Sequence, residues 1–256
     1  MSGQPGTPSA RDVFGRRAEY YTTSPVHVDP AKLADLVELV RPEPHWRVAD
    51  VGTGTGHTAF AFAPRVRFVI GLDPTPEMLA EALALRERHG LSNVHFCLGD
   101  ALALPFAARS LDLITCRRAA HHFPDLRTAL DEARRALRPG GLLLIDDRSV
   151  PEDDFVDRIM NHLDLLHDPS HVREYRPSEW KAALESSGFA VEHLSLATQH
   201  RPITALTDNA GPEQAAEVLA ILQGLSDSQR RALNVTGEGT ELYTDHWYVT
   251  ALARLA

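Results

Sequence analysis

Two adjacent histidines follow an apolar stretch near the middle of the chain. His121 and His122 come shortly after Leu111–Cys116, whose apolar and β-branched residues predict a buried strand. An imidazole titrates near neutral pH, so either ring is suited to take a proton from an acceptor or to hold it by a hydrogen bond. We therefore take both as candidate catalytic residues. A packing role for one or both is the alternative.

A glycine-rich stretch earlier in the chain is suited to hold a cofactor. Asp50 ends a short apolar run, and Gly52, Gly54 and Gly56 follow at every second position. Glycine allows a sharp turn, and without a Cβ it lets a ligand lie directly against the main chain. The spacing predicts a helix over Thr58–Ala63, whose first amides carry partial positive charge. A strand, a glycine loop and a helix in this order predict a cofactor site.

The spacing of the glycines argues against two common cofactor motifs. A dinucleotide-binding loop reads G-x-G-x-x-G, but here Gly56 comes one residue early and His57 occupies the third glycine's position. No phosphate-binding lysine follows, so the P-loop pattern also fails. An NAD-linked oxidoreductase is therefore a disfavoured alternative.

An acidic residue at the end of the next apolar run is placed for a ribose. Asp73 follows the predicted strand 66–72 and lies about 20 residues after Gly54, the distance expected for a ribose-binding carboxylate. Such a carboxylate accepts hydrogen bonds from both ribose hydroxyls. The alternative is that Asp73 caps the helix predicted from Thr75 to about His89.

These residues require a scaffold of alternating strands and helices. Helices are predicted between the strands, and a proline at position 30 after Asp29 marks the start of the first. This alternation predicts an α/β fold, a doubly wound and mostly parallel sheet of seven strands. The predicted strands cover residues 48–51, 66–72, 93–98, 111–116, 142–146, 189–196 and 243–255.

Five sequence blocks occur in an order and spacing that resemble a known family. They are Asp50–Gly56, Gly71–Asp73, Gly99–Ala101, Ala120–Phe123 and Ala136–Gly141. The chain resembles the class I S-adenosylmethionine (SAM) methyltransferases of type 11, the group that includes ubiquinone and menaquinone biosynthesis enzymes. The resemblance covers residues 45–147 and is specific for SAM rather than for the substrate. Residues 161–174 are similar to a bacterial subgroup whose acceptor is unknown.

The resemblance implies a cofactor and the residues that contact it. SAM would be the methyl donor and S-adenosylhomocysteine the product, with the Asp100 carboxylate on the adenine amino group and the next amide facing the ring. Arg117 would offer its backbone to the methionine end. The implied cofactor contacts are Tyr21, Asp50, Gly52, Thr53, Gly54, Gly56, Asp73, Pro74, Met78, Asp100, Ala101, Arg117 and His122.

The chain is longer than a minimal fold of this class. We expect residues 1–28 to form a tail and lid, and residues 29–256 to form one SAM-binding domain. Insertions at about 151–176 and 200–240 are expected to cap the substrate side, because structureless loops of such length are uncommon in compact domains. Three histidines in the first insertion match no zinc spacing, so no metal is expected.

Composition limits the remaining possibilities. The 256 residues carry a formal net charge of −9, which disfavours a nucleic-acid partner. No secretory signal and no apolar run long enough for a membrane span is visible, so a cytoplasmic protein is expected. Cys97 and Cys116 fall in strand-like runs and are expected to be buried and reduced. The predicted function is methyl transfer to a small molecule, by a monomer or a homodimer. A non-catalytic SAM-binding regulatory or scaffold protein is the alternative.

Overall fold

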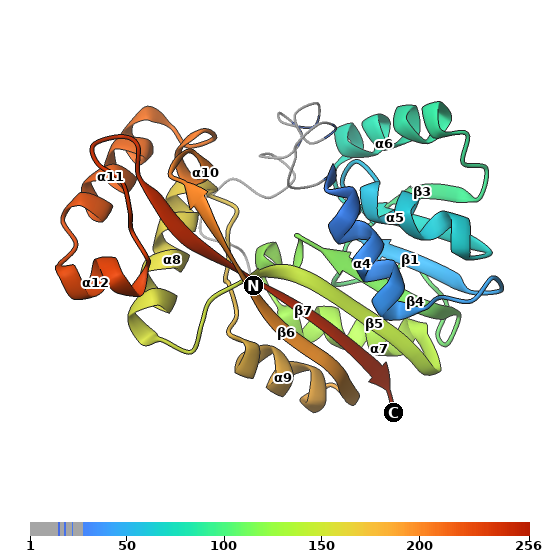
Figure 1. Ribbon diagram of the computed structural model, residues 1–256. Coiled ribbons are helices and arrows are strands. Elements are labelled where there is room, and N and C mark those ends of the chain that lie inside the picture. The colour runs from blue at the N-terminus through green and yellow to red at the C-terminus, as the bar shows by residue number, and fades with distance from the viewer. Residues whose placement is uncertain (1–14, 16–17, 19–21, 23–27) are drawn as a thin grey trace.

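The computed structural model describes Gly15, Ala18, Thr22 and residues 28–256 (Figure 1). Seven strands form one sheet in the order β3-β2-β1-β4-β5-β7-β6, in which only β7 runs against its neighbours. The strands are β1 (Arg47–Val51), β2 (Phe68–Asp73), β3 (Val94–Leu98), β4 (Leu111–Arg117), β5 (Leu137–Ser149), β6 (Phe189–Pro202) and β7 (Tyr243–Leu255). The predicted doubly wound fold is confirmed.

Helices lie on both faces of this sheet and beyond one end of it. Asp29 caps the first helix by accepting hydrogen bonds from the amides of Ala31 and Lys32, with Pro30 in the first turn as predicted. The helices are α4 (Pro30–Val40), α5 (His57–Phe62), α6 (Pro76–His89), α7 (Leu126–Ala136), α8 (Asp154–His167), α9 (Pro177–Ser186), α10 (Thr204–Thr207), α11 (Pro212–Gln223) and α12 (Asp227–Ala232). Two short 3-10 turns are η1 (Ala63–Arg65) and η2 (Ala120–His122).

Side-chain alternation along the strands builds two cores. Val48 and Leu113 face one side of the sheet and pack with residues of α4 and α5. Ile114 and Ile145 face the other side and pack with residues of α7 and α9. Because strands covered on both faces must bury both sets of side chains, they read as nearly continuous apolar runs.

The fifth strand is longer than the predicted 142–146. It begins at Leu137, so residues 138–141, which lie before the predicted start, also belong to it. The strand passes through this stretch with a register shift opposite Leu111–Leu113, and Gly140 takes a φ of +75°. Glycine adopts this left-handed conformation without strain, so the strand bulges instead of ending.

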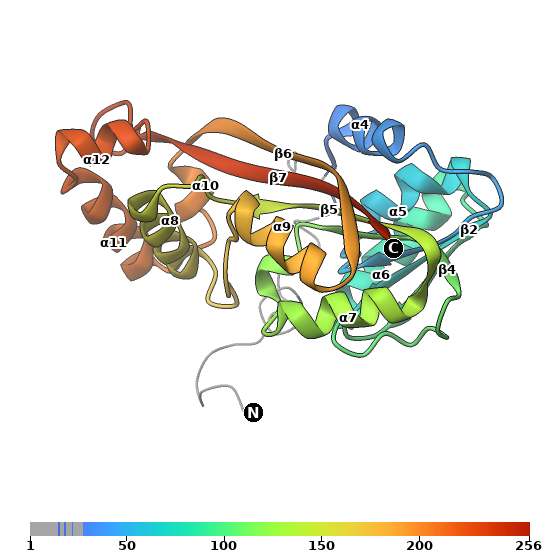
Figure 2. The ribbon, with the colours of Figure 1, turned by 90° about the horizontal axis from the view of Figure 1, so that it is seen from below.

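The sixth strand also exceeds its prediction, because it pairs with β7 as far as Pro202 and Tyr243. Its second half is mostly exposed and therefore has no apolar periodicity that would reveal a strand. The long β6–β7 hairpin extends to a layer of helices (Figure 2). We call α8, α10, α11 and α12 the helical lobe; residues of α8 and α11 share a buried cluster that includes Leu163, Val218 and Leu222.

Other expectations are resolved in part. Cys116 is buried and Cys97 is half-buried, and both are free thiols. Within the described residues, no helix is both long and apolar enough to cross a membrane. Tyr21 and most of the predicted lid over residues 1–28 lie outside the described residues.

Candidate cofactor and acceptor site

The three loop glycines have different surroundings. Gly52, Gly54 and Gly56 all have positive φ angles, of 68°, 52° and 92°. A Cβ at Gly52 would stand 2.4 Å from the Ala119 Cβ, and one at Gly56 would stand 2.7 Å from the Phe60 ring. A Cβ at Gly54 would meet nothing within 4 Å. Packing therefore requires two of these glycines, whereas Gly54 borders open space that suits a ligand.

Asp73 lies at the end of β2 and binds the glycine loop directly. Its Oδ2 accepts a hydrogen bond from the Gly54 amide at 2.9 Å, and its Oδ1 accepts one from the Thr75 amide at 2.9 Å. Burial raises the pKa of this carboxyl, and the two backbone hydrogen bonds oppose that rise. The carboxylate predicted to hold the ribose therefore also fixes the turn before α6. Of the neighbours predicted to contact the cofactor, Pro74 is exposed and Met78 is buried in α6.

Asp50 stabilises the glycine loop by hydrogen bonds within the protein. Its Oδ2 accepts a hydrogen bond from the Thr53 hydroxyl at 2.7 Å, and its Oδ1 accepts one from the Thr115 hydroxyl of β4 at 2.6 Å. Burial raises its pKa to about 6 against the lowering effect of the two hydroxyls. Because both oxygens are engaged within the protein, Asp50 and Thr53 fix the loop shape. Sequence reasoning missed Thr115, which the pairing of β1 with β4 brings beside Asp50.

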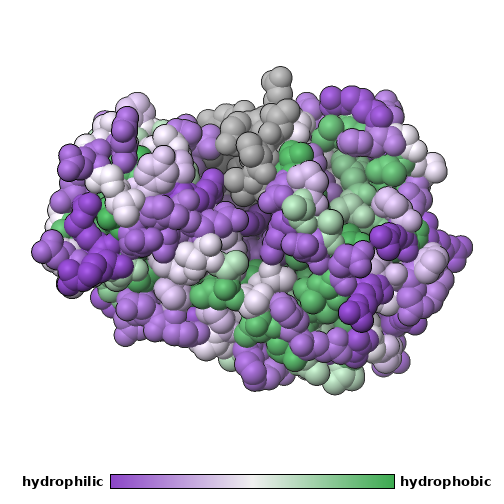
Figure 3. Space-filling model, viewed as in Figure 1, coloured by the Kyte–Doolittle hydropathy of each residue, from purple (hydrophilic) through white to green (hydrophobic). Residues whose placement is uncertain are grey.

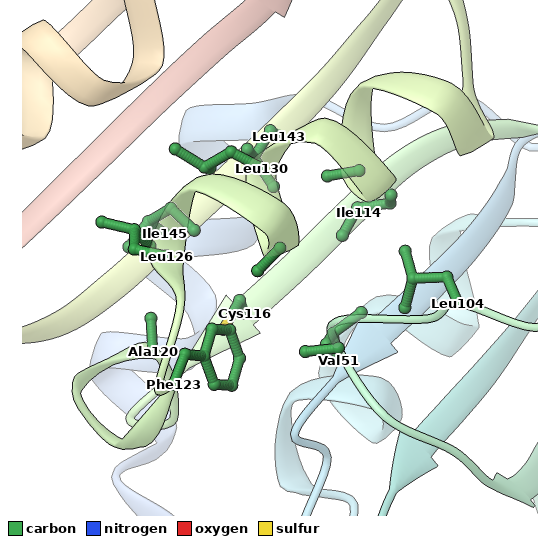
Figure 4. A pocket seen from close by; sticks show the side chains of 13 residues that line it. Val51, Leu104, Ile114, Cys116, Ala120, Phe123, Leu126, Leu130, Leu143 and Ile145 are labelled. Atoms are coloured by element: carbon green, nitrogen blue, oxygen red, sulfur yellow. The ribbon is translucent and has the colours of Figure 1, made fainter. Parts of the chain in front are cut away.

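The predicted adenine residues follow β3. Asp100 is exposed, and its Oδ1 accepts a hydrogen bond from the Leu102 amide at 2.9 Å. Ala101 is buried and lines an apolar cavity of about 30 Å³ between the ends of β1 and β4 and α7 (Figure 4). A cavity of this volume holds about two water molecules, so it is too small for an adenine ring. It is a gap in the core beneath the predicted adenine position.

His121 forms a buried pair with an acid that sequence reasoning did not select. Its Nδ1 lies 2.5 Å from Oδ1 of Asp147, whose Oδ2 accepts a hydrogen bond from the His121 amide at 3.1 Å. Burial raises the pKa of Asp147, but the His121 charge and hydrogen bond and the Arg148 amide together hold that pKa below its ordinary value. An ionised Asp147 accepts from Nδ1–H, so the other ring nitrogen, Nε2, is left as the basic one. The sequence could have suggested Asp147, because it lies near the C-terminal end of β5, and ligands bind at this edge of a parallel sheet.

His122 has a different environment. Its Nδ1 lies 3.1 Å from the Ser170 carbonyl oxygen and 3.2 Å from the Ser170 hydroxyl. Burial, with the nearby His121 charge, lowers its pKa to about 3. A neutral His122 is therefore suited to hydrogen bonding rather than to carrying a proton at neutral pH. The carbonyl oxygen of His121 also accepts hydrogen bonds from the amides of Val172 and Arg173. These bonds connect the segment after α8 to η2.

Arg117 lies at the end of β4 in an ion cluster. Its Nε is 3.4 Å from Oδ2 of the fully buried Asp146, whose Oδ1 is 2.9 Å from the Lys32 ammonium. Burial and the neighbouring Arg118 charge lower the pKa of Arg117, partly offset by Asp146. The cluster joins α4 to β4 and β5 beside the glycine loop. In the part of the chain that the structure describes, no three His, Cys, Asp or Glu side chains are grouped to hold a metal.

Comparisons with known proteins agree with this geometry. A family model described as a methyltransferase domain matches residues 42–203. The Bacillus subtilis methyltransferase YcgJ is 41% identical over 181 residues, which are 71% of this chain and 72% of that protein. Demethylmenaquinone methyltransferase of Thermus thermophilus is 39% identical over 111 residues, 43% of this chain and 50% of that protein.

Solved structures show the same likeness over most of the chain. A methyltransferase structure from Bacillus halodurans gives a TM-score of 0.84 at 32% identity, covering 88% of this chain and 98% of that chain. The YcgJ structure gives 0.80 at 33% identity, covering 87% and 97%. These matches confirm the type 11 resemblance. The chain therefore belongs to the methyltransferase family and is a SAM-dependent methyltransferase.

Proposed function

We propose that the protein transfers a methyl group from SAM to a small-molecule acceptor at the C-terminal edge of β4 and β5. The observation that carries this proposal is the position of the buried His121–Asp147 pair, one short turn after β4 and beside the glycine loop. Ala119, between this turn and the strand, touches the Gly52 position directly. Ligands in open α/β sheets bind at this edge.

The cofactor is proposed to lie across the ends of β1, β2 and β3. Asp73 would hold the ribose, Asp100 would accept from the adenine amino group, and the open space at Gly54 would admit the methionine part. Tyr21, Pro74, Met78, Ala101 and Arg117 are the further proposed contacts, and His122 would hold the acceptor beside them.

The chemistry needs little covalent participation by the protein. Bound SAM supplies an electrophilic methyl group on a positively charged sulfur. The acceptor's lone pair forms the new bond to that methyl carbon, and the departing sulfur keeps the electrons of the old bond. The protein must align the two reactants and exclude water. His121 is proposed to take the acceptor's proton on Nε2, with Asp147 stabilising the resulting imidazolium.

The helical lobe supports a small acceptor enclosed by the protein. It lies beyond the C-terminal end of β5, and α8 is the next helix along the chain after this strand. We propose that residues 29–256 form one SAM-binding domain, in which residues 151–176 and 200–240 act together as a cap over the acceptor side. The net charge of −9 supports a small molecule over a nucleic acid as the acceptor.

The test is product formation from labelled SAM with a panel of hydroxylated, amino and carbon-acid metabolites. Asp147→Asn should lower kcat by about 10²–10⁴-fold, the usual contribution of a positioned general base, and leave S-adenosylhomocysteine affinity unchanged. Asp245→Asn, at an acid that also contacts a histidine but lies in the β6–β7 hairpin, is the matched control and should keep full activity. Undiminished kcat in Asp147→Asn would contradict the role of the pair. Cofactor binding without turnover of any acceptor would favour a non-catalytic SAM-binding protein.

A further inference from the structure

One face of the sheet changes from apolar to polar toward the acceptor edge. On β5, Leu142 and Leu144 pack beneath α4 and α5, but the next residues on the same face are Asp146 and Arg148. The opposite face of the same strand stays apolar through Ile145. Neighbouring strands change at the same level, since their paired residues on this face are Asp50, Thr115, Arg117, Thr250, Tyr248 and His246.

Three arginines gather around one buried tyrosine in this polar layer. The Arg118 guanidinium lies 3.7 Å from the centroid of the Tyr248 ring, and Arg201 Nη1 donates to the Tyr248 hydroxyl at 3.1 Å. Arg148 is the direct strand partner of Tyr248. Although burial raises the pKa of Tyr248, the charges of Arg118, Arg148 and Arg201 together bring it below its ordinary value. The surroundings of this phenol therefore favour negative charge.

The carboxylates nearby neutralise only part of this charge. Arg148 is paired with Asp164 and Glu174, and burial raises the pKa of Glu174 well above its ordinary value, with Asp164 adding to the rise. Burial and the neighbouring Asp164 therefore disfavour the ionised form of Glu174 beside Arg148. Arg118 Nε is 3.8 Å from Oδ2 of Asp146, and the same carboxylate also forms ion pairs with Lys32 and Arg117. Among the described residues, Arg201 has no ion pair with a carboxylate.

A buried histidine in the same layer has unfilled hydrogen-bonding capacity. His246 is 1% exposed, and neither of its ring nitrogens has a hydrogen-bond partner among the described residues. It lies two residues before Tyr248, so its side chain is on the same face of β7. Buried polar groups are rarely left unpaired, because each one costs about 1–3 kcal/mol. The unpaired ring is an independent sign that this layer accommodates a ligand.

This layer is next to the proposed methyl-transfer site. Arg118 directly follows β4, and its amide donates to the Asp146 carbonyl at 2.9 Å. It has a φ of +55°, a strained conformation for a residue with a side chain, and such strain is concentrated at functional sites. The next residue, Ala119, packs on the glycine loop. Figure 3 shows hydrophilic residues gathered in the middle of this face, between the helical lobe and the parallel strands.

We propose that Arg118, Arg201 and His246 bind an oxyanion of the methyl acceptor, a carboxylate or a phosphate. This inference rests on the proposed function and adds the chemical class of the substrate. Arginine suits such a group, because its planar guanidinium donates two parallel hydrogen bonds to it. The chain as a whole carries a formal net charge of −9, which repels anions. A local surplus of arginines would therefore attract an anionic acceptor to this position in particular.

The experiment titrates three probes into the full-length protein saturated with S-adenosylhomocysteine. The probes are benzoate, phenyl phosphate and the neutral benzamide, followed by calorimetry and ligand-observed NMR. We expect at least one anion to bind about tenfold or more tightly than benzamide, the factor that one hydrogen bond to a charged group supplies. Arg201→Gln should remove about the same factor for the anion and leave both benzamide and S-adenosylhomocysteine unaffected. Arg134→Gln, the same charge change at an exposed position on α7, is the matched control and should bind like the wild type.

Three outcomes would overturn the inference. Equal or undetectable binding of all three probes would mean that the layer selects no anion. Unchanged anion affinity in both Arg201→Gln and Arg118→Met would place the anion elsewhere. Competition between the anion and S-adenosylhomocysteine would mean that the arginines serve the cofactor's own carboxylate. Failure of the proposed function is distinguishable, because it is measured separately, as absent S-adenosylhomocysteine binding or as cofactor binding without turnover of any acceptor.

Discussion

At the scale of single residues, Asp73 is proposed to perform two tasks with one carboxylate. It holds the amides of Gly54 and Thr75, which fixes the glycine loop against the start of α6. Each carboxylate oxygen has a second acceptor position, so both can also receive a ribose hydroxyl. A residue that shapes the site and also contacts the ligand has an effect on both folding and binding when it is replaced.

Asp73→Ala should weaken S-adenosylhomocysteine binding by about 1.5–3 kcal/mol, the range for hydrogen bonds to a charged group. Calorimetry measures the affinity, and urea unfolding measures the accompanying loss of stability. Asp125→Ala is a matched control, because Asp125 also accepts an amide near a helix start, at Thr128 of α7. That variant should lose stability alone. Equal affinity of Asp73→Ala and the wild type would exclude Asp73 from the ribose site.

Gly54 and Gly90 form a second matched pair. Both have positive φ angles, of 52° and 65°, and a Cβ at either position would meet nothing within 4 Å. Valine at either position should therefore cost similar backbone strain, on the order of 1–2 kcal/mol. Only Gly54→Val should abolish S-adenosylhomocysteine binding, because only its side chain would enter the cofactor's path. Equal affinities of the two variants by titration would show that the loop is merely a turn.

At the scale of elements, the helical lobe depends on the β6–β7 hairpin and α8 together. Leu163 of α8 and Leu222 of α11 belong to one buried apolar cluster, although the two helices are far apart in the sequence. Removing residues 202–240 would therefore expose the apolar face of α8. A single substitution in the shared core tests the cap with less damage.

Leu222→Ala should lower the stability of the lobe by about 2–5 kcal/mol, the usual effect of truncating a fully buried leucine. Methylation should fall much more than S-adenosylhomocysteine affinity, since the cofactor residues lie on other elements. Leu184→Ala is equally buried, in the core beneath α9, and should not separate the two quantities in this way. Full turnover by a folded Leu222→Ala protein with a demonstrably loosened lobe would contradict the cap.

At the scale of the whole molecule, the interior holds neutral histidines. Burial lowers the pKa of His246 and His122 to about 3 and that of His171 to about 4. Unfolded histidines take up protons below about pH 6.5, whereas these do not until the pH is much lower. Proton uptake by each of these histidines in the unfolded chain therefore lowers the stability of the folded state as the pH falls through 6.5. Asp50 acts in the opposite sense, because burial raises its pKa to about 6.

Stability should therefore fall between pH 7 and pH 5, because four histidines whose pKa values are lowered by burial, including His167, oppose the buried carboxyls with raised pKa values, chiefly Asp50 and Glu174. His246 alone contributes up to roughly 2 kcal/mol over this interval. Urea unfolding at the two pH values measures the change, and His246→Leu should make it smaller by about that amount. His95, exposed on β3, supplies the matched control His95→Leu, which should leave the pH dependence as it is. A wild-type protein equally stable at both pH values would refute this account.

The sequence by itself determined the sheet, the cofactor and the family. Buried strands read as apolar runs, and the glycine loop with Asp73 depends on residues whose spacing along the chain is short and fixed. The strand ends were less predictable where side chains face solvent, as in the second half of β6, or where a glycine bulge continues a strand, as at Gly140.

Only the tertiary structure decided which distant groups meet at the acceptor side. Asp147 reaches His121, and Arg201 reaches Tyr248, through strand pairing and chain reversals between residues far apart in sequence. The three predicted insertion histidines also separated, with His171 against Asn161 and His167 against the Leu206 carbonyl. Local patterns record which face of an element is buried, but they do not record what lies opposite, because that depends on the register and order of strands across the whole sheet.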